Sequence, residues 1–199
     1  MEQFSTELLF WKDPPENYSI SADRIVIETE PGTDLWQRTY YGFRNDNAPA
    51  LLMSSDREFL SFSVKTEFDS SILYDQCGVV LYQDSENWLK ASCEYENSDF
   101  QRLGSVVTNH GFSDWATCDI STEQRAIWYR LSRRKNDYCV ESSFDGVHYQ
   151  QMRICHLWAG GGTIHFGLYA CSPGQSTFRA VFSEMHLGEC VWTLQGDNT

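Results

Sequence analysis

The clearest periodic pattern of the chain lies in residues 76–96, QCGVVLYQDSENWLKASCEYE, where two apolar runs flank a short polar segment. In each run every second residue is apolar. Because successive side chains of a strand point to opposite faces, both runs are predicted to be strands. Asp84 to Asn87 supply the short polar side chains that favour a tight connection. The stretch is therefore predicted to be a β-hairpin with one buried face.

The other face of the second run carries an aromatic ring, a cation, a hydroxyl and a carboxylate, in the order Trp88, Lys90, Ser92 and Glu94. Such a row can line a binding surface. It can equally be the solvated or packed face of a sheet, because exposed strands alternate apolar and polar residues and Trp packs well on a pleat. Periodicity locates faces and not ligands, so both interpretations stay open.

The same alternation recurs along the chain at roughly ten-residue spacing, without a convincing helical period. It is cleanest at Phe59–Phe68 and returns at Ala126–Arg134. We expect about a dozen short strands, including a first strand over Thr6–Trp11 and a last one within Gly188–Thr199. This pattern predicts an all-β fold, a two-sheet antiparallel sandwich that forms a single domain over residues 1–199.

Several polar or glycine-rich segments are predicted to be connections. Asp145-Gly146 supplies the positive φ values of a two-residue hairpin turn. The three glycines at 160–162 lack the spacing of a phosphate-binding loop, and no helical pattern follows them, so a plain loop is expected. Residues 110–114 are expected to be a loop after a strand, and the basic run Arg133–Lys135 is predicted to be a solvated turn.

Composition and charge narrow the class of partner. The 199 residues are 41% hydrophobic and 22% charged, which is typical of a globular domain. The formal net charge of −13 repels phosphate backbones and anionic lipid. No apolar run reaches the roughly 18 to 20 residues of a membrane helix. We therefore expect neither nucleic acid nor a membrane as a partner.

The seven cysteines are an odd number without a CxxC pair, which favours neither a complete set of disulfides nor a zinc site. The first residues lack the basic and apolar regions of a signal peptide. Together these features predict a reduced, cytoplasmic protein. The five histidines are scattered and no ladder of Asp and Asn at calcium-ligand spacing is present, so no metal and no cofactor are expected.

Several separated blocks of the sequence resemble one known family. Its core motif is similar to YDQCGVVLYQDSENWLKASCEYE at residues 74–96 and LGSVVTNHGFSDWAT at residues 103–117. Further similar blocks occupy residues 33–49, 127–153 and 167–187. The family is that of the yeast "regulation of enolase" protein, which has the concanavalin A-like lectin/glucanase fold. The resemblance implies this jelly-roll sandwich and a role in controlling enolase and carbohydrate metabolism.

The resemblance also points to the concave face of one sheet as the place for a ligand. Glucanases that resemble this fold often carry an ExDxxE strand, which is absent here, although Glu94 and Glu96 have a spacing that puts two carboxylates on one face. The leading hypothesis is a non-catalytic binding protein with enolase as its partner and no catalytic residue. The alternative is a carbohydrate-binding or glycoside-hydrolase-like protein. The candidate ligand-binding residues are Trp36, Arg38, Tyr40, Trp88, Lys90, Glu94, Trp115 and Arg130.

Overall fold

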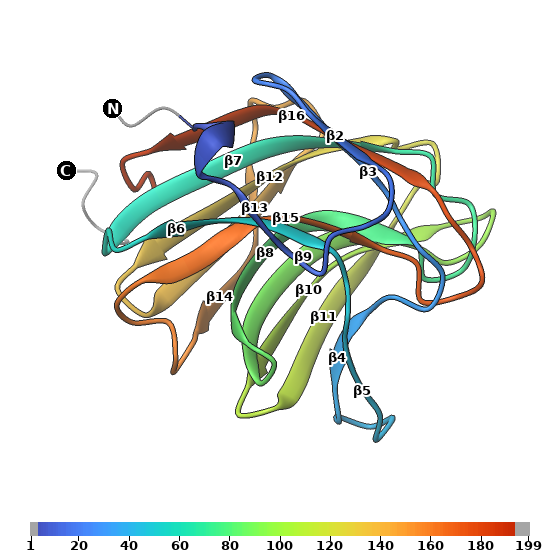
Figure 1. Cartoon of the computed structure of the whole chain (residues 1–199), viewed down its shortest axis with the longest axis horizontal. Coiled ribbons are helices and arrows are strands. Elements are labelled where there is room, and N and C mark those ends of the chain that lie inside the picture. The colour runs from blue at the N-terminus through green and yellow to red at the C-terminus, as the bar shows by residue number, and fades with distance from the viewer. Residues whose placement is uncertain (1–3, 194–199) are drawn as a thin grey trace.

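The computed structural model describes residues 4–193, which form a sandwich of two seven-stranded antiparallel sheets (Figure 1). Sheet A has the order β1 (Phe10–Lys12), β6 (Ala50–Ser55), β15 (Ile164–Cys171), β8 (Gln76–Asp84), β9 (Asn87–Tyr95), β10 (Gln101–Asn109), β11 (Phe112–Ile120). Sheet B has the order β14 (Gln150–His156), β13 (Asp137–Ser143), β12 (Ala126–Arg134), β7 (Phe59–Phe68), β16 (Arg179–Gly188), β3 (Arg24–Glu28), β2 (Tyr18–Ile20). The two-sheet sandwich predicted from the sequence pattern is confirmed.

The main core lies between the sheets, because each central strand turns every second side chain inward. Leu89, Ala91 and Cys93 of β9 are at most 2% exposed, and they pack in one cluster with Phe62 and Val64 of β7. Each fully buried aliphatic or aromatic side chain contributes roughly 1.5–3 kcal/mol relative to an exposed one. The face of each strand that carries the alternating apolar residues is thus the internal one, as the sequence pattern indicates.

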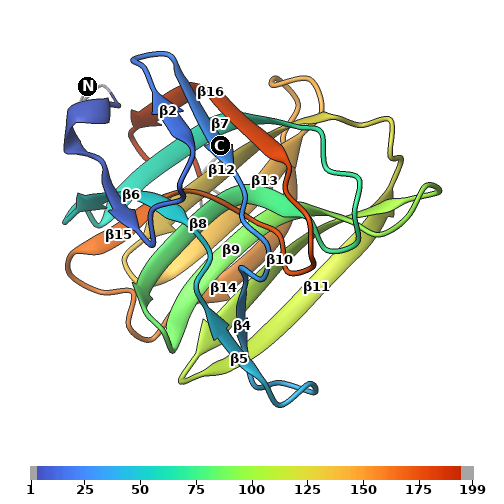
Figure 2. The same cartoon turned by 45° about the vertical axis from the view of Figure 1, so that its right-hand side comes forward.

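A third, two-stranded sheet consists of β4 (Leu35–Gln37) and β5 (Arg44–Asp46), and it joins neither large sheet (Figure 2). We call it the β4–β5 hairpin. Beneath it, on the outer face of sheet A, lies a second apolar cluster of Leu35, Ala48, Ala50, Leu52, Val80, Trp88, Val106, Tyr169 and Cys171. Sheet A is therefore buried on both faces at this end, which explains why its central strands are apolar in nearly every position.

Two predicted element boundaries are wrong at the edges of sheet A. The expected strand Thr6–Trp11 begins as a 3-10 turn, Thr6–Leu8, because only residues 10–12 pair with β6. The expected loop at residues 110–114 is a tight reversal at His110 and Gly111, whose φ values are 52° and 73°. Two consecutive positive φ values suit a two-residue hairpin turn, so β11 starts at once with Phe112.

Two further predictions fail in sheet B. The expected last strand within Gly188–Thr199 is absent from residues 189–193, since β16 ends at Gly188, and residues 194–199 lie outside the described part of the chain. The connection from β13 to β14 is longer than two residues, because the Asp145 carboxylate accepts hydrogen bonds from the Val147 and His148 amides at 2.8 Å each. That local turn delays the start of β14 to Gln150.

The predicted solvated turn at Arg133–Lys135 is wrong for Arg133, which is 1% exposed. Its guanidinium donates to four backbone carbonyls, those of Lys135, Arg57, Gly160 and Gly162, at 2.7–3.1 Å. A buried guanidinium needs such partners to replace water. The glycine-rich loop at 160–162 is therefore a plain loop, as expected, that folds over an internal arginine.

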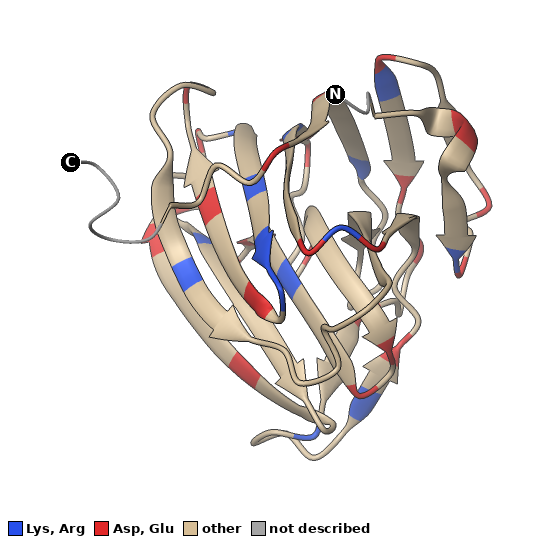
Figure 3. Cartoon of the chain, turned by 90° about the vertical axis from the view of Figure 1, so that its left-hand side faces the viewer, with Lys and Arg blue, Asp and Glu red and all other residues tan. Residues whose placement is uncertain are grey.

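Elsewhere the charged residues are spread along the strands, with basic and acidic positions interspersed on the face that Figure 3 shows. Among the described residues, no helix has both the length and the apolar character that crossing a bilayer requires. Within residues 4–193, no three His, Cys, Asp or Glu side chains are grouped closely enough to hold a metal ion.

Candidate functional site

A cleft of about 370 Å³ lies on the outer face of sheet A, bounded at one side by the β4–β5 hairpin. Pockets that hold small molecules range from roughly 300 to 1,000 Å³, so the cleft is large enough for a compact ligand. It is lined by Asp34, Trp36, Tyr41, Phe43, Asn45, Tyr74, Gln76, Lys90, Ser92, Glu94, Arg102, Gly104, Ser105, Val106, Trp115 and Pro173.

The floor of the cleft follows from the strand register. Val106 of β10 pairs with Lys90 of β9 on one side and with Trp115 of β11 on the other. Directly paired residues of antiparallel strands point to the same face, so these three side chains form one row. Four positions further along the strands, Glu94 pairs with Arg102 in a parallel row. The register thus places side chains from three strands around one cavity.

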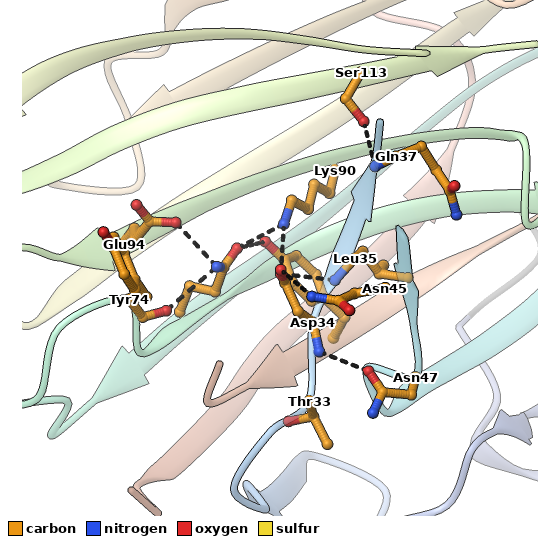
Figure 4. Close-up of polar contacts among 12 residues, drawn as sticks. Thr33, Asp34, Leu35, Gln37, Asn45, Asn47, Tyr74, Lys90, Glu94 and Ser113 are labelled. Atoms are coloured by element: carbon orange, nitrogen blue, oxygen red, sulfur yellow. Dashed lines mark hydrogen bonds and ion pairs between the residues drawn. The ribbon is translucent and has the colours of Figure 1, made fainter. Parts of the chain in front are cut away.

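A buried hydrogen-bond network crosses this floor (Figure 4). The Lys90 side chain is 4% exposed, and its Nζ donates to Gln76 Oε1 at 2.9 Å and lies 3.6 Å from Asp34 Oδ1. Gln76 Nε2 in turn donates to Glu94 Oε2 at 3.0 Å, and the Tyr169 hydroxyl donates to Gln76 Oε1 at 3.0 Å. Because an unpaired buried ammonium costs several kcal/mol, these contacts hold Lys90 in a fixed position.

The β4–β5 hairpin brings the acidic partner of Lys90 into the cleft. Asp34 immediately precedes β4, and its Oδ1 accepts the Leu35 amide at 2.7 Å. Its Oδ2 accepts from Asn45 Nδ2 of β5 at 3.3 Å. Both carboxylate oxygens are therefore held by the hairpin's own groups, which orient Asp34 toward Lys90.

Glu94 has an unusual protonation equilibrium. Burial raises the pKa of its carboxyl to about 7, against the lowering influence of the Lys90 charge and with a further increase from Asp34 and Glu96. Loss of hydration disfavours the charged form of a carboxyl group. Near neutral pH Glu94 is accordingly present in both forms, so it can accept or donate a hydrogen bond.

Two indole rings form the apolar walls of the cleft. The rings of Trp36 and Trp115 have centroids 6.5 Å apart and planes at 85°, and the Arg102 guanidinium lies 5.5 Å from the centre of the Trp115 ring. Gly104 lies under the second indole, since a Cβ there would come within 3.1 Å of Trp115 Nε1 and 2.9 Å of the Ala116 carbonyl oxygen. The missing side chain lets the indole lie close to the strand.

Four of the eight predicted ligand-binding residues line the cleft, namely Trp36, Lys90, Glu94 and Trp115. Trp115 does so from strand β11. Arg38 and Tyr40 belong to the turn of the β4–β5 hairpin but do not line the cleft. Arg38 forms an ion pair with Glu86 at 2.8 Å, and Tyr40 is 93% exposed.

The structure does not bring Trp88 and Arg130 into the cleft. Trp88 is 0% exposed, because the β4–β5 hairpin covers it in the second apolar cluster, so its face is closed to a ligand. Arg130 lies on β12 of sheet B, where it donates to both oxygens of Glu141 at 2.7 and 2.8 Å and covers the Tyr149 ring. It has no part in the face that carries Lys90.

The polar residues of the cleft that the sequence interpretation missed include Asp34, Gln76 and Arg102. A signal for Gln76 existed, because its parity in the predicted hairpin is opposite to that of the apolar Cys77 and matches that of the polar row. Glu96, considered there as a second carboxylate, forms an ion pair with Arg102 at 3.1 Å and does not line the cleft.

Comparison with known proteins finds relatives that are similar in sequence and in structure. "Regulation of enolase protein 1" from Saccharomyces cerevisiae is 30% identical over 189 residues, 94% of this chain and 93% of the relative. The crystal structure of a functionally unknown protein from Saccharomyces cerevisiae matches with a TM-score of 0.86 at 27% identity, over 94% of this chain and 98% of that chain.

More distant structures share the fold alone. A mutant of the GH43 protein BlXynB from Bacillus licheniformis has a TM-score of 0.73 at 18% identity, over 94% of this chain and 38% of that chain. A legume lectin-like domain from Entamoeba histolytica has a TM-score of 0.60 at 11% identity, over 92% of this chain and 90% of that chain. The concanavalin A-like sandwich predicted from the sequence is thus confirmed. Since residues 11–190 also match the family model described as "Protein of unknown function (DUF1349)", the chain belongs to that family.

Proposed function

We propose that this protein is a non-catalytic, cytoplasmic binding protein whose cleft on sheet A holds a small polyhydroxylated ligand of the carbohydrate class. We further propose that binding serves the regulation of enolase and of carbohydrate metabolism. The observation that carries the first part is the combination, in one cavity, of two perpendicular indole walls with a fixed polar floor.

That combination matches the chemistry of a sugar ring. The apolar C–H faces of a sugar can stack on an indole, while its hydroxyl groups need donors and acceptors whose positions are fixed in advance. Trp36 and Trp115 supply the rings, and Lys90 and Glu94 supply polar atoms at the floor. Lys90 offers three N–H donors, and its Nζ donates to Gln76 Oε1 at 2.9 Å and lies 3.6 Å from Asp34 Oδ1, so donor capacity remains for a ligand.

The same contacts favour binding over catalysis. Glycoside hydrolysis needs two carboxyl groups that face the sugar, one of them free to act as nucleophile or base. Asp34 uses both oxygens on its own hairpin and is turned toward Lys90, and Glu96 forms an ion pair with Arg102 and does not line the cleft. Glu94 is the remaining acidic side chain in the lining, and a single carboxyl group suits hydrogen bonding to a hydroxyl.

A sugar panel tests this proposal. We expect monosaccharides and short oligosaccharides of gluco, galacto, xylo and manno series to include a ligand, detected by calorimetry, whose affinity falls at least tenfold in the Trp115→Ala variant. Trp158→Ala is the matched control, since that indole is 67% exposed and does not line the cleft. Absence of binding across the panel, or equal losses in both variants, would overturn the carbohydrate proposal.

The enolase part of the proposal is supported by the name of the yeast relative, which covers nearly the whole chain. The compartment is supported by seven free cysteines, since reduced thiols are usual in the cytosol. We expect purified enolase to bind the protein saturably in calorimetry or to change its turnover when the protein is added. Binding should be measured with and without the sugar identified above. An enolase that neither binds nor changes its rate would overturn this part alone.

A further inference from the structure

We propose that the cleft receives one end of a carbohydrate chain, or a free short sugar, and excludes the internal segments of a polysaccharide. This inference rests on the proposed function and concerns the shape of the site. The β4–β5 hairpin closes one end of the cleft and leaves the other end open.

The closed end is marked by a row of buried residues across sheet A. Trp88 and Thr108 pair across β9 and β10, and Thr108 pairs with Ser113 of β11, so the three share the outer face with the cleft floor. Trp88 and Thr108 are 0% exposed and Ser113 is 2% exposed. They lie only two positions along their strands from the row of Lys90 and Trp115. A ligand on the floor therefore cannot continue along the sheet in this direction.

The hairpin that covers this row is firmly attached to the sheet. The Gln37 amide donates to Ser113 Oγ at 3.0 Å, and Arg38 Nη1 donates to the Gly111 carbonyl at 2.8 Å. At the other strand of the hairpin, the Tyr82 hydroxyl donates to Asp46 Oδ2 at 2.8 Å. The hairpin is thus held at both of its strands, and its packing on Trp88 excludes water from the row below.

Exposure increases toward the opposite end of the cleft. In the row of Glu94 and Arg102 both side chains are partly exposed, and Asp119, the residue paired with Arg102 on β11, is exposed. In an open groove a chain enters at one end and leaves at the other. Here the row of Trp88, Thr108 and Ser113 closes one end, so a chain that lies along the strands has to terminate within the cleft.

A further aromatic ring lies at the open end of the cleft and suits the part of the chain that leaves it. Tyr74 lines the cleft and is 47% exposed, and its amide donates at 2.8 Å to the carbonyl of Tyr95, the neighbour of Glu94. Tyr41 and Phe43 line the cleft from the β4–β5 hairpin and stack with their ring centres 5.5 Å apart at 23°. Sugar units beyond the buried end can contact the Tyr74 ring without entering the cavity.

The test uses polysaccharides whose number of ends is varied at constant mass. Xylan, mannan, pullulan and mixed-linkage β-glucan are each compared before and after partial hydrolysis that raises the number of chain ends tenfold. For whichever polymer binds, we expect the number of protein molecules bound per gram to rise about tenfold in calorimetry. Equal capacity before and after hydrolysis would show binding to internal segments and overturn the inference while leaving the proposed function intact.

A pair of variants separates the buried end from the open end. Tyr74→Ala is expected to weaken binding of a hexasaccharide about fivefold, through loss of one stacking ring at the open end, and to leave a monosaccharide or disaccharide nearly unchanged. Phe144→Ala is the matched control, because that ring is 51% exposed and follows β13 of sheet B. An equal loss for short and long ligands contradicts an end-on arrangement. If no sugar or polymer binds, the proposed function fails and this inference fails with it.

Discussion

The outer faces of the two sheets carry similar side chains in similar order, yet they form different environments. On β9 of sheet A, Trp88 and Lys90 occupy alternate positions, and on β12 of sheet B, Trp128 and Arg130 do the same. Trp88 is 0% exposed and Lys90 4%, whereas Trp128 and Arg130 are both partly exposed. The pattern along each strand is the same, and the burial is not.

The difference arises from the β4–β5 hairpin, which covers only sheet A. On sheet B the polar groups pair with one another at the surface, as Lys65 does with Glu67 at 3.5 Å and Trp128 Nε1 does with Glu184 at 2.9 Å. Such exposed pairs contribute about 0–1 kcal/mol, because water competes for the same groups. On sheet A the same chemistry is desolvated, so each group depends on its protein partners. Burial by a distant segment turns a surface row into a site.

The largest expected difference in stability between the two faces comes from removing the indoles of Trp88 and Trp128. We expect Trp88→Ala to lower the free energy of unfolding by about 3–5 kcal/mol, because the cavity left under the hairpin cannot fill. Trp128→Ala should cost about 1 kcal/mol, since its ring keeps solvent contact. Urea denaturation followed by circular dichroism measures both. Comparable losses in the two variants contradict the burial difference between the faces.

The two lysines provide the next contrast. Lys90→Met leaves Asp34 without its cation in a buried site, and we expect it to destabilise the protein by about 3 kcal/mol. Lys65→Met removes a surface cation that lies 3.5 Å from Glu67 and 5.0 Å from the centre of the Trp128 ring, and the expected cost is about 0–1 kcal/mol. Thermal and urea unfolding at pH 7 distinguish these values. A neutral Lys90→Met would mean that the network on the cleft floor contributes nothing to stability.

Replacing Glu94 on sheet A and Glu141 on sheet B by glutamine is expected to change stability at pH 8 in opposite directions. Because the folded-state pKa of Glu94 is raised to about 7, the folded protein holds an extra proton between about pH 4.5 and 7. Stability from this group is complete below that window and is lost as the pH rises through it. The amide of the Glu94→Gln variant cannot ionise, so at pH 8 we expect this variant to be more stable than the wild type. The expected gain in the free energy of unfolding is about 2 kcal/mol, which is less than the full pKa shift implies because the carboxyl group is partly exposed.

The matched variant on sheet B is Glu141→Gln, which takes the charge from the ion pair with Arg130 at 2.7 Å. We expect it to be less stable than the wild type at pH 8 by about 1 kcal/mol, because the pair is partly exposed. Urea unfolding between pH 5 and pH 8 measures the difference from wild type. A Glu94→Gln variant whose advantage does not grow with pH would contradict the raised pKa of Glu94.

These contrasts also define what the sequence can and cannot predict. Period-2 alternation found the strands Phe59–Phe68 and Ala126–Arg134 with the bounds that the structure has, because alternation depends only on neighbours along the chain. It also assigned the two faces of β9 correctly. It cannot distinguish Trp88 from Trp128, since the covering hairpin comes from residues 35–46, far away in the sequence.

The sequence could predict those residues of the candidate site that lie together on one strand. Lys90 and Glu94 lie on the same strand with the same parity, so a single periodic stretch suggested both. Asp34 reaches the cleft through the hairpin, and Arg102 through the register of β10. Arg130 was placed with them because no local pattern says which sheet a strand joins. Strand order is decided by packing between segments, and this information is absent from periodicity.

The smallest expected effect concerns the attachment of the hairpin itself. Arg38 donates to the Gly111 carbonyl at 2.8 Å and pairs with Glu86 at 2.8 Å, while Arg44 lies 3.7 Å from the same carboxylate and is 55% exposed. We expect Arg38→Ala to cost about 1 kcal/mol and Arg44→Ala a few tenths or less. Hydrogen exchange should locate the loss in residues 35–46 and in the strand ends around Trp88, with the amides of sheet B unchanged.

The Arg38 contacts should also affect how far Trp88 is shielded from solvent. If the hairpin alone makes the outer face of sheet A different from that of sheet B, loosening it raises the solvent exposure of Trp88 without touching that residue. Quenching of tryptophan fluorescence by acrylamide in Arg38→Ala, with Arg44→Ala beside it, measures this directly. An Arg38→Ala protein with unchanged quenching and unchanged exchange would mean that packing of Leu35 and Trp36 on the sheet suffices to hold the hairpin, and that the arginine contacts are not needed.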